Sequence, residues 1–320
     1  MAQEYDIIII GGGAAGLTAG LYAARARRKT ILFEKAVPGG QIATTSLVEN
    51  YPGFPEGIDG PDLAERMEEQ AKKYGLEMVF AEAEGLTIQG ARRVVHTSEG
   101  EFVGKAVIIT SGAEHRKLGV PGEAELTGRG VSYCATCDAA FFKDQVVVVV
   151  GGGDAALDEG LFLTRYAAKV IVVHRRDQLR ASRVLQERAF ATPKMEFVWD
   201  TVVEEILGES KVGGVRVRNV KTGQGRTIAA DGVFVYIGLV PQSDFLKGLL
   251  PIDGGGHLEA NLWMETAIPG VFAAGDVRVN AARQLVSAAG DGCTAAIRAD
   301  HYLNDLIAQE QATEPERARA

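Results

Sequence analysis

The chain has 320 residues, enough for two domains, and a formal net charge of −8 from 34 basic and 42 acidic residues. This acidic balance argues against nucleic acid as a partner, because nucleic-acid-binding proteins normally present a basic face. With only three cysteines the chain does not resemble a disulfide-stapled secreted domain, so a reducing, cytoplasmic compartment is expected.

The first elements predict a strand, a glycine turn, a helix and a second strand. Ile7–Ile10 is the apolar run of a strand buried on both faces of a parallel sheet, and Leu17–Arg28 is an alanine-rich helix. Ile31–Phe33 is a second buried strand. The uncharged stretch 7–24 is not expected to span a membrane, because three consecutive glycines interrupt it.

The turn between these elements has the G-x-G-x-x-G spacing of a dinucleotide-binding unit, formed by Gly11, Gly13 and Gly16. Such a turn lets the backbone approach a pyrophosphate, which then lies at the positive end of the helix. Glu34 ends the following strand, where a carboxylate can accept hydrogen bonds from ribose hydroxyls. We therefore predict a Rossmann-type βαβ unit here.

The same succession of elements recurs later in the chain. Val146–Val150 predicts a strand, Ala155–Tyr166 a helix and Val170–Val173 the returning strand. The intervening turn has the G-x-G-x-x-A spacing, with Gly151, Gly153 and Ala156 as its small residues. The chain is thus predicted to contain two dinucleotide-binding domains.

No acidic residue follows the second returning strand. His174, Arg175 and Arg176 stand there instead, with Arg180 shortly after them. Guanidinium groups pair with phosphate in a bidentate manner, so this cluster predicts recognition of the 2′-phosphate of NADPH in preference to NADH. The alternative is an ordinary solvated basic cluster on the surface.

The remaining pattern predicts that the second domain is inserted into the first. A final apolar strand ends in Gly275-Asp276, a signature that closes the flavin domain of two-dinucleotide flavoproteins. The domain boundaries predicted from this are 1–113 and 244–320 for the FAD-binding domain and 114–243 for the NADPH-binding domain. The other elements predicted are a helix at Pro61–Tyr74 and strands at Val107–Thr110, Phe197–Val203, Val215–Val220, Gly232–Ile237 and Val271–Ala274.

Cys134 and Cys137 form a Cys-x-x-Cys pair directly before the second glycine turn. A structural zinc site needs about four ligands, and neither a second such pair nor a histidine pair is present, so no metal is expected. The pair could be two inert buried thiols, but the nearby nicotinamide site favours a redox-active dithiol. Asp138 beside them could shuttle the proton that dithiol exchange requires.

In combination, these motifs resemble those of the bacterial low-molecular-weight thioredoxin reductases over essentially the whole chain. The segments that carry the resemblance are Gly11–Gly16, Pro38–Gln41, Val48–Gly53, Cys134–Asp138, Gly151–Ala156, His174–Arg180, Gly275–Val277 and Arg283-Gln284. The family implies a homodimer with FAD and NADPH as cofactors and thioredoxin as the disulfide substrate. It also implies that Cys137 faces the flavin, that Cys134 attacks thioredoxin and that Asp138 is the acid/base.

The resemblance also implies two sets of cofactor-binding residues. The FAD set is Gly11, Gly13, Ala14, Ala15, Gly16, Glu34, Lys35, Gly39, Gly40, Gln41, Asn50, Gly275, Asp276, Arg283, Gln284 and Leu285. The NADPH set is Gly151, Gly153, Asp154, Ala155, Ala156, His174, Arg175, Arg176 and Arg180. Ala139 departs from the family, which commonly has glycine there, and Ala155 stands near a position where a hydroxyl residue is frequent.

Other functions remain open at this point. The flavoprotein that supplies an alkyl hydroperoxide peroxidase normally carries a further N-terminal thioredoxin-like region, which is not expected here. Ferredoxin–NADP reductases of similar fold lack the dithiol, and a dithiol oxidase that uses oxygen would lack the basic cluster. A nucleotide-sensing binding protein with regulatory thiols is the alternative from a different class.

Overall fold

The computed structural model describes residues 4–45 and 47–317. The chain divides into two compact units, one made of the residues up to Glu114 together with those from Val240 onward, the other of His115–Leu239. The chain passes between them twice, in the short strands β7 (Ala113–His115) and β16 (Leu239–Pro241), which pair with each other. Within the described residues, no helix is both long and apolar enough to span a bilayer.

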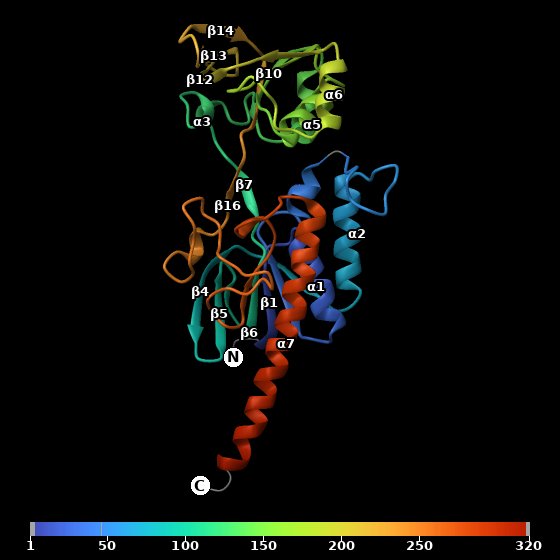
Figure 1. Cartoon of the computed structure of the whole chain (residues 1–320), viewed down its shortest axis with the longest axis vertical. Coiled ribbons are helices and arrows are strands. Elements are labelled where there is room, and N and C mark those ends of the chain that lie inside the picture. The colour runs from blue at the N-terminus through green and yellow to red at the C-terminus, as the bar shows by residue number, and fades with distance from the viewer. Residues whose placement is uncertain (1–3, 46, 318–320) are drawn as a thin grey trace. The chain divides into compact units, whose positions relative to one another are not determined.

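The first unit is built around one sheet with the strand order β3-β2-β1-β6-β5-β4, with β17 also paired to β6 (Figure 1). Strands β1, β2, β3, β6 and β17 are parallel, and the hairpin of β4 and β5 extends the sheet in antiparallel fashion. The bounds are β1 Glu4–Ile10, β2 Thr30–Glu34, β3 Glu77–Phe80, β4 Ala83–Gln89, β5 Arg92–Thr97, β6 Gly100–Ile109 and β17 Val271–Ala273.

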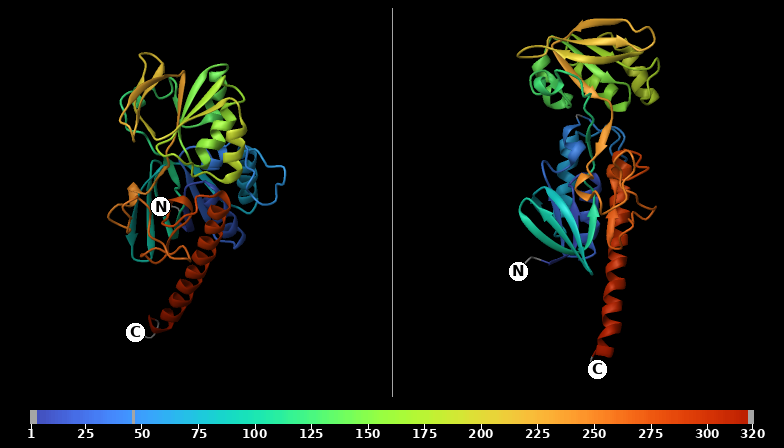
Figure 2. Two further views of the ribbon diagram at one scale, coloured as in Figure 1. Left: turned by 45° about the horizontal axis from the view of Figure 1, so that its top comes forward. Right: turned by 90° about the vertical axis from the view of Figure 1, so that its left-hand side faces the viewer.

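Helices cover one face of this sheet, and one of them, α1 (Ala14–Arg25), begins directly after the glycine turn. The longer helices are α1, α2 (Gly60–Lys72) and α7 (Leu285–Arg317). α1 and α7 run side by side (Figure 1), so closely that a Cβ on Gly292 would lie 2.0 Å from the carbonyl oxygen of Ala15. Figure 2 shows the last turns of α7 continuing past the sheet of this unit. The C-terminal segment therefore completes the first unit.

The second unit contains a parallel sheet with the order β11-β10-β9-β15-β8 and a separate antiparallel sheet with the order β12-β13-β14. The strands are β8 Val131–Ser132, β9 Val146–Gly151, β10 Lys169–Val173, β11 Met195–Val198, β12 Thr201–Leu207, β13 Gly214–Asn219, β14 Gly225–Ala229 and β15 Gly232–Tyr236. The helices are α3 Glu123–Leu126, α4 Ala135–Asp138, α5 Asp154–Leu163 and α6 Arg183–Ala191.

The fold class predicted from the sequence is confirmed: both units have a parallel sheet with a strand–glycine turn–helix–strand unit at its centre. One predicted strand is wrong. Phe197–Val203 is not a single strand but belongs to β11 and β12, which lie in different sheets. The break falls at Asp200, whose φ of +52° ends the extended conformation.

Candidate cofactor and redox sites

The three glycines of the first turn have three different surroundings. Gly11 has a φ of +104°, and a Cβ there would lie 2.4 Å from the carbonyl oxygen of Thr110. A Cβ on Gly16 would lie 1.9 Å from the oxygen of Gly11, so this position packs helix against strand. Gly13, by contrast, faces open space, because the nearest atom to its Cβ position is an oxygen of Gly39 at 4.0 Å. The turn therefore leaves room for a ligand only at Gly13.

That open space lies at the start of α1, where Gly13 is the N-cap and has no side-chain capping bond. The first amides of a helix lack intrahelical acceptors and carry the positive end of the helix dipole. A pyrophosphate group fits this arrangement, because it is anionic and accepts several hydrogen bonds. The geometry of the first turn is thus that of a dinucleotide site.

Glu34 is buried at the end of β2 and binds the same turn. One carboxylate oxygen accepts from the amide of Gly12 at 2.6 Å, and the other accepts from the amide of Ala36 at 2.8 Å. Each oxygen can accept a further bond, so contact with a ribose remains open to it. The ammonium of Lys35 lies 2.5 Å from Glu114, and this hydrogen bond raises the pKa of Lys35.

The segment 38–41 lies directly beside the first glycine turn. The amide of Gly39 donates to the oxygen of Gly12 at 2.8 Å, and a bridge joins Gly39 to Gly13. A Cβ on Gly40 would lie 3.4 Å from Cα of Gly13. The side chain of Gln41 donates to the oxygen of Ala113 at 3.1 Å. The predicted FAD residues 39–41 are therefore close to Gly13 in space.

Gly275 brings the C-terminal part of the chain to the same helix. A Cβ on Gly275 would lie 3.0 Å from that of Ala15, and its amide donates to Asp291 at 3.1 Å. Asp276, the next residue, is largely buried, and desolvation raises the pKa of its carboxyl group. A largely buried carboxyl group next to Gly275 is suited to accept a hydrogen bond from a ligand hydroxyl.

Two further predicted residues meet across a large sequence separation. The side-chain amide of Asn50 donates to that of Gln284 at 3.2 Å. Gln284 directly precedes Leu285, where α7 begins. Arg283 has a φ of +56°, and its guanidinium lies 3.2 Å from the ring of His257.

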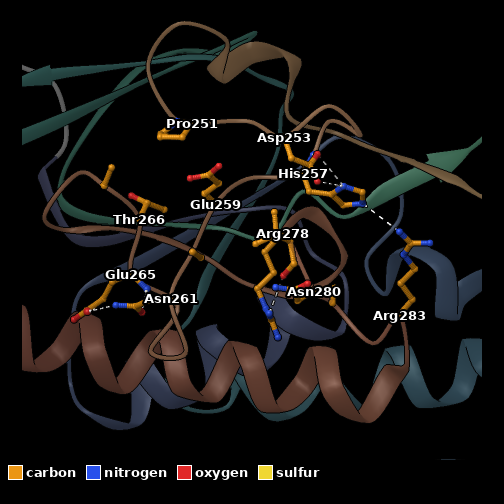
Figure 3. A pocket seen from close by; sticks show the side chains of 14 residues that line it. Pro251, Asp253, His257, Glu259, Asn261, Glu265, Thr266, Arg278, Asn280 and Arg283 are labelled. Carbon is orange, nitrogen blue, oxygen red and sulfur yellow. Dashed lines mark hydrogen bonds and ion pairs between the residues drawn. The ribbon is translucent and has the colours of Figure 1, made fainter.

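Arg283 lies at the edge of a cavity of about 880 Å³ within the first unit (Figure 3). It is the only predicted site residue that lines this cavity. Other lining residues are engaged with each other, since His257 lies 3.1 Å from Asp253 and Asn261 donates to Glu265 at 2.8 Å. Because the glycine turn does not contribute to it, we do not assign the nucleotide to this cavity.

The second unit carries the dithiol pair, which is oxidised. Cys134 and Cys137 form a disulfide with their Cα atoms 5.4 Å apart. Cys134 is the N-cap of the short helix α4, and the amide of Cys137 donates to its sulfur at 3.1 Å. Cys134 is half-buried, whereas Cys137 is exposed in this unit. Ala139 has helical angles of −55° and −35°, which alanine adopts freely, so this departure from the family leaves the turn intact.

A buried carboxyl group that the sequence did not reveal lies beneath the disulfide turn. Glu159 is largely buried, and desolvation, reinforced by the charge of Asp158, raises its pKa to about 7. The amides of Ala135 and Thr136 oppose this shift. One carboxyl oxygen of Glu159 has no hydrogen-bond partner among the described residues. The phenol of Tyr236 accepts from the amide of Ala135 at 2.9 Å. The only sequence signal for Glu159 is a charge within an otherwise mainly small and apolar helix.

The second glycine turn repeats the first. Gly151 has a φ of +154°, and a Cβ there would lie 2.3 Å from the oxygen of Tyr236. Gly153 is the N-cap of α5, and no atom lies within 4 Å of its Cβ position. Ala156, in the third position, is fully buried. The open position therefore again precedes a helix, which suits a second dinucleotide.

The two residues after Gly153 differ in their surroundings. The carboxylate of Asp154 accepts from the amide of Ser182 at 2.6 Å, so it holds the loop that follows the basic cluster. Ala155 is exposed at the start of α5.

The four residues of the basic cluster do not lie in one environment. His174 is 5 % exposed and packs under Gly152, and burial lowers the pKa of its imidazole. Arg175, Arg176 and Arg180 are exposed and line a cavity of about 380 Å³. The structure gives these three arginines no ion pair with any described residue, which leaves their guanidinium groups available to a phosphate.

The comparisons with known proteins identify the family of this chain. A family model described as pyridine nucleotide-disulphide oxidoreductase matches residues 5–292. The chain belongs to this family. It is 50 % identical over 309 residues to the thioredoxin reductase of Bacillus subtilis (strain 168), covering 96 % of this chain and 98 % of that protein. It is 48 % identical over 318 residues to that of Streptomyces clavuligerus, covering 98 % and 99 %.

The solved structures that this chain resembles are also thioredoxin reductases. Lactococcus lactis thioredoxin reductase in its FR conformation matches with a TM-score of 0.92 at 45 % identity, covering 94 % of this chain and 99 % of that one. T. acidophilum thioredoxin reductase matches with a TM-score of 0.90 at 35 % identity, covering 95 % and 99 %. The predicted resemblance to bacterial thioredoxin reductases is confirmed.

Proposed function

We propose that this protein is an NADPH-dependent thioredoxin-disulfide reductase, in which electrons pass from NADPH through FAD and the Cys134–Cys137 disulfide to thioredoxin. The observation that carries the proposal is the Cys134–Cys137 disulfide at the start of a helix in a chain with two glycine turns, each open at one position. Sequence identity of 48–50 % to thioredoxin reductases over nearly the whole chain supports the proposal.

FAD is assigned to the first unit. Gly13 and the start of α1 would hold its pyrophosphate, and Glu34 its ribose, with the rest of the predicted FAD set around them. NADPH is assigned to the second unit, with Gly153 and the start of α5 at its pyrophosphate and the exposed arginines at its 2′-phosphate. When bound, the two cofactors supply hydride transfer from the nicotinamide and reduction of the disulfide by the flavin.

The chain's own residues carry the exchange with thioredoxin. In the reduced enzyme, the thiolate of Cys134 attacks a sulfur of the thioredoxin disulfide, and the other thioredoxin sulfur leaves as a thiolate that takes up a proton. The thiolate of Cys137 then attacks Cys134 in the mixed disulfide, which restores the enzyme disulfide and releases reduced thioredoxin. Asp138, which directly follows Cys137 in α4, is proposed to move the protons.

The order of the two cysteines can be tested by trapping. A Cys137→Ser variant keeps the attacking thiol. It should form a stable mixed disulfide with a single-cysteine thioredoxin whose thiol is first converted to a disulfide with thionitrobenzoate, which then leaves as the thiolate. A Cys134→Ser variant should not. Cys137 is the more exposed of the two cysteines in this structure. If only the Cys134→Ser variant were trapped, Cys137 would be the residue that attacks thioredoxin, and the assignment would be reversed.

The overall proposal is tested by steady turnover. Purified protein with FAD, NADPH and excess oxidised thioredoxin should oxidise NADPH continuously and produce two thioredoxin thiols for each NADPH oxidised. A regulatory nucleotide-binding protein would instead oxidise no more NADPH than one equivalent per disulfide. We further propose a homodimer in the cytoplasm, which gel filtration with light scattering and cell fractionation would test.

A further inference from the structure

Lys221 occupies the turn between β13 and β14. The side-chain oxygen of Asn219 accepts from the amides of Lys221 at 3.0 Å and Thr222 at 2.9 Å, which fixes the turn. The ammonium of Lys221 lies 2.9 Å from a carboxylate oxygen of Asp177 and 3.0 Å from one of Asp200. One lysine thus holds two carboxylates from other parts of the unit.

Asp200 attaches this turn to the end of β10. Its amide donates to the oxygen of Arg176 at 3.2 Å, and its own carbonyl oxygen accepts from Val220 at 2.6 Å. Its side chain is only 16 % exposed, which makes it the buried half of the lysine contact. Lys221 is therefore placed at the cavity by backbone hydrogen bonds as well as by charge.

Asp177 directly follows Arg175 and Arg176 and lines the same cavity, with 65 % of its side chain exposed. A carboxylate at this position could pair with one of the arginines, but in the structure it pairs with Lys221. The hydrogen bond to Lys221 lowers the pKa of Asp177. The cavity lining holds four cations and two carboxylates, a formal charge of 4 − 2 = +2, which becomes +1 without the lysine.

We propose that Lys221 is a positioning residue for coenzyme specificity: by pairing with Asp177 it keeps Arg175 and Arg176 free for the 2′-phosphate. This inference rests on the proposed function, because it concerns the same coenzyme site. Lys221 acts through Asp177, so the effect of removing it depends on the aspartate being charged. A neutral residue at 177 should make the lysine dispensable.

The test measures binding of adenosine 2′,5′-bisphosphate and of 5′-AMP to the FAD-loaded protein by calorimetry, together with KM and kcat for NADPH and NADH. The variants are Lys221→Met, Lys221→Arg, Asp177→Asn and the double variant of Lys221→Met with Asp177→Asn. Lys169→Met is the matched control. Lys169 is the first residue of β10, the strand that precedes the basic cluster, and it forms a single exposed ion pair with Glu196 at 2.7 Å.

Lys221→Met should weaken binding of the bisphosphate and raise KM for NADPH about two- to fivefold, the range of one exposed charge pair. The affinity for 5′-AMP, the KM for NADH and kcat should not change. Lys221→Arg, the double variant and Lys169→Met should bind like the wild type. An unchanged Lys221→Met, or a double variant that stays weak, overturns the inference. A wild-type protein that does not prefer the bisphosphate to 5′-AMP contradicts the NADPH assignment itself, and therefore the proposed function.

Discussion

Alanine substitutions at Gly13 and Gly153 would separate the two nucleotide sites. Both glycines are N-caps with extended backbone, at φ −72° and −100°, which alanine can adopt. A Cβ at Gly13 meets nothing closer than 4.0 Å, and one at Gly153 meets nothing within 4 Å. Neither methyl group therefore clashes with the protein itself.

The expected cost to folding is small. Alanine is a poorer N-cap than glycine by roughly 0.5–1 kcal/mol, and replacing glycine restricts the unfolded chain by a similar amount of about 0.4–1 kcal/mol. The two contributions have opposite signs, so the melting temperature should change by no more than a few degrees, on the order of ΔΔG divided by the entropy of unfolding.

The expected cost to ligand binding is much larger, because at each proposed site the methyl group would occupy the space through which a pyrophosphate approaches the backbone. Loss of two charge-assisted hydrogen bonds, each about 1.5–3 kcal/mol, weakens binding by about 3–6 kcal/mol. That corresponds to roughly two to four orders of magnitude in Kd. Gly13→Ala should therefore lose FAD, whereas Gly153→Ala should lose NADPH affinity and keep FAD.

The assay compares flavin absorbance per protein, FAD affinity after reconstitution and NADPH binding in both variants, with circular dichroism and melting curves to confirm folding. Gly16→Ala is a contrasting variant, because its methyl group would lie 1.9 Å from the oxygen of Gly11 and should destabilise the fold itself. A folded Gly13→Ala protein with normal FAD affinity would refute the argument, as would loss of FAD in Gly153→Ala alone.

Three further predictions concern the second unit. Replacing Cys134 or Cys137 by serine should abolish thioredoxin reduction while NADPH still reduces the flavin, and wild-type turnover in either variant would exclude the disulfide mechanism. Changing Arg175 and Arg176 to alanine should weaken NADPH binding about ten- to a hundredfold and spare NADH, whereas equal losses would indicate a structural role. Burial raises the pKa of Glu159 from 4.5 to about 7, so between these pH values the folded protein keeps a proton that the unfolded chain has lost. The free energy of unfolding therefore falls as pH rises through this range, by about 3 kcal/mol at most. Glu159→Gln should remove this loss, which melting curves at pH 5 and pH 8 would detect as a gain for the variant at the higher pH only.

The sequence by itself determined the local units of this protein. Strands buried on both faces are continuous apolar runs, and the residues between Ile10 and Ala14 must turn sharply, so the strand, glycine turn and helix were all predictable from neighbours in the chain. The disulfide between Cys134 and Cys137 was also predictable from the sequence, because two intervening residues allow the sulfurs to meet. These features depend on short-range spacing, which a sequence displays directly.

Only the tertiary structure decided which distant segments share a site and which polar groups are buried. Asn50 meets Gln284 across more than two hundred residues, and pairing at such separation leaves no periodic pattern in the sequence. His174 looks like one more cation of a basic cluster, yet it is buried beneath a glycine. The raised pKa of Glu159 and the pairing of Lys221 likewise arise from packing, because desolvation and charge depend on distances in space rather than on order along the chain.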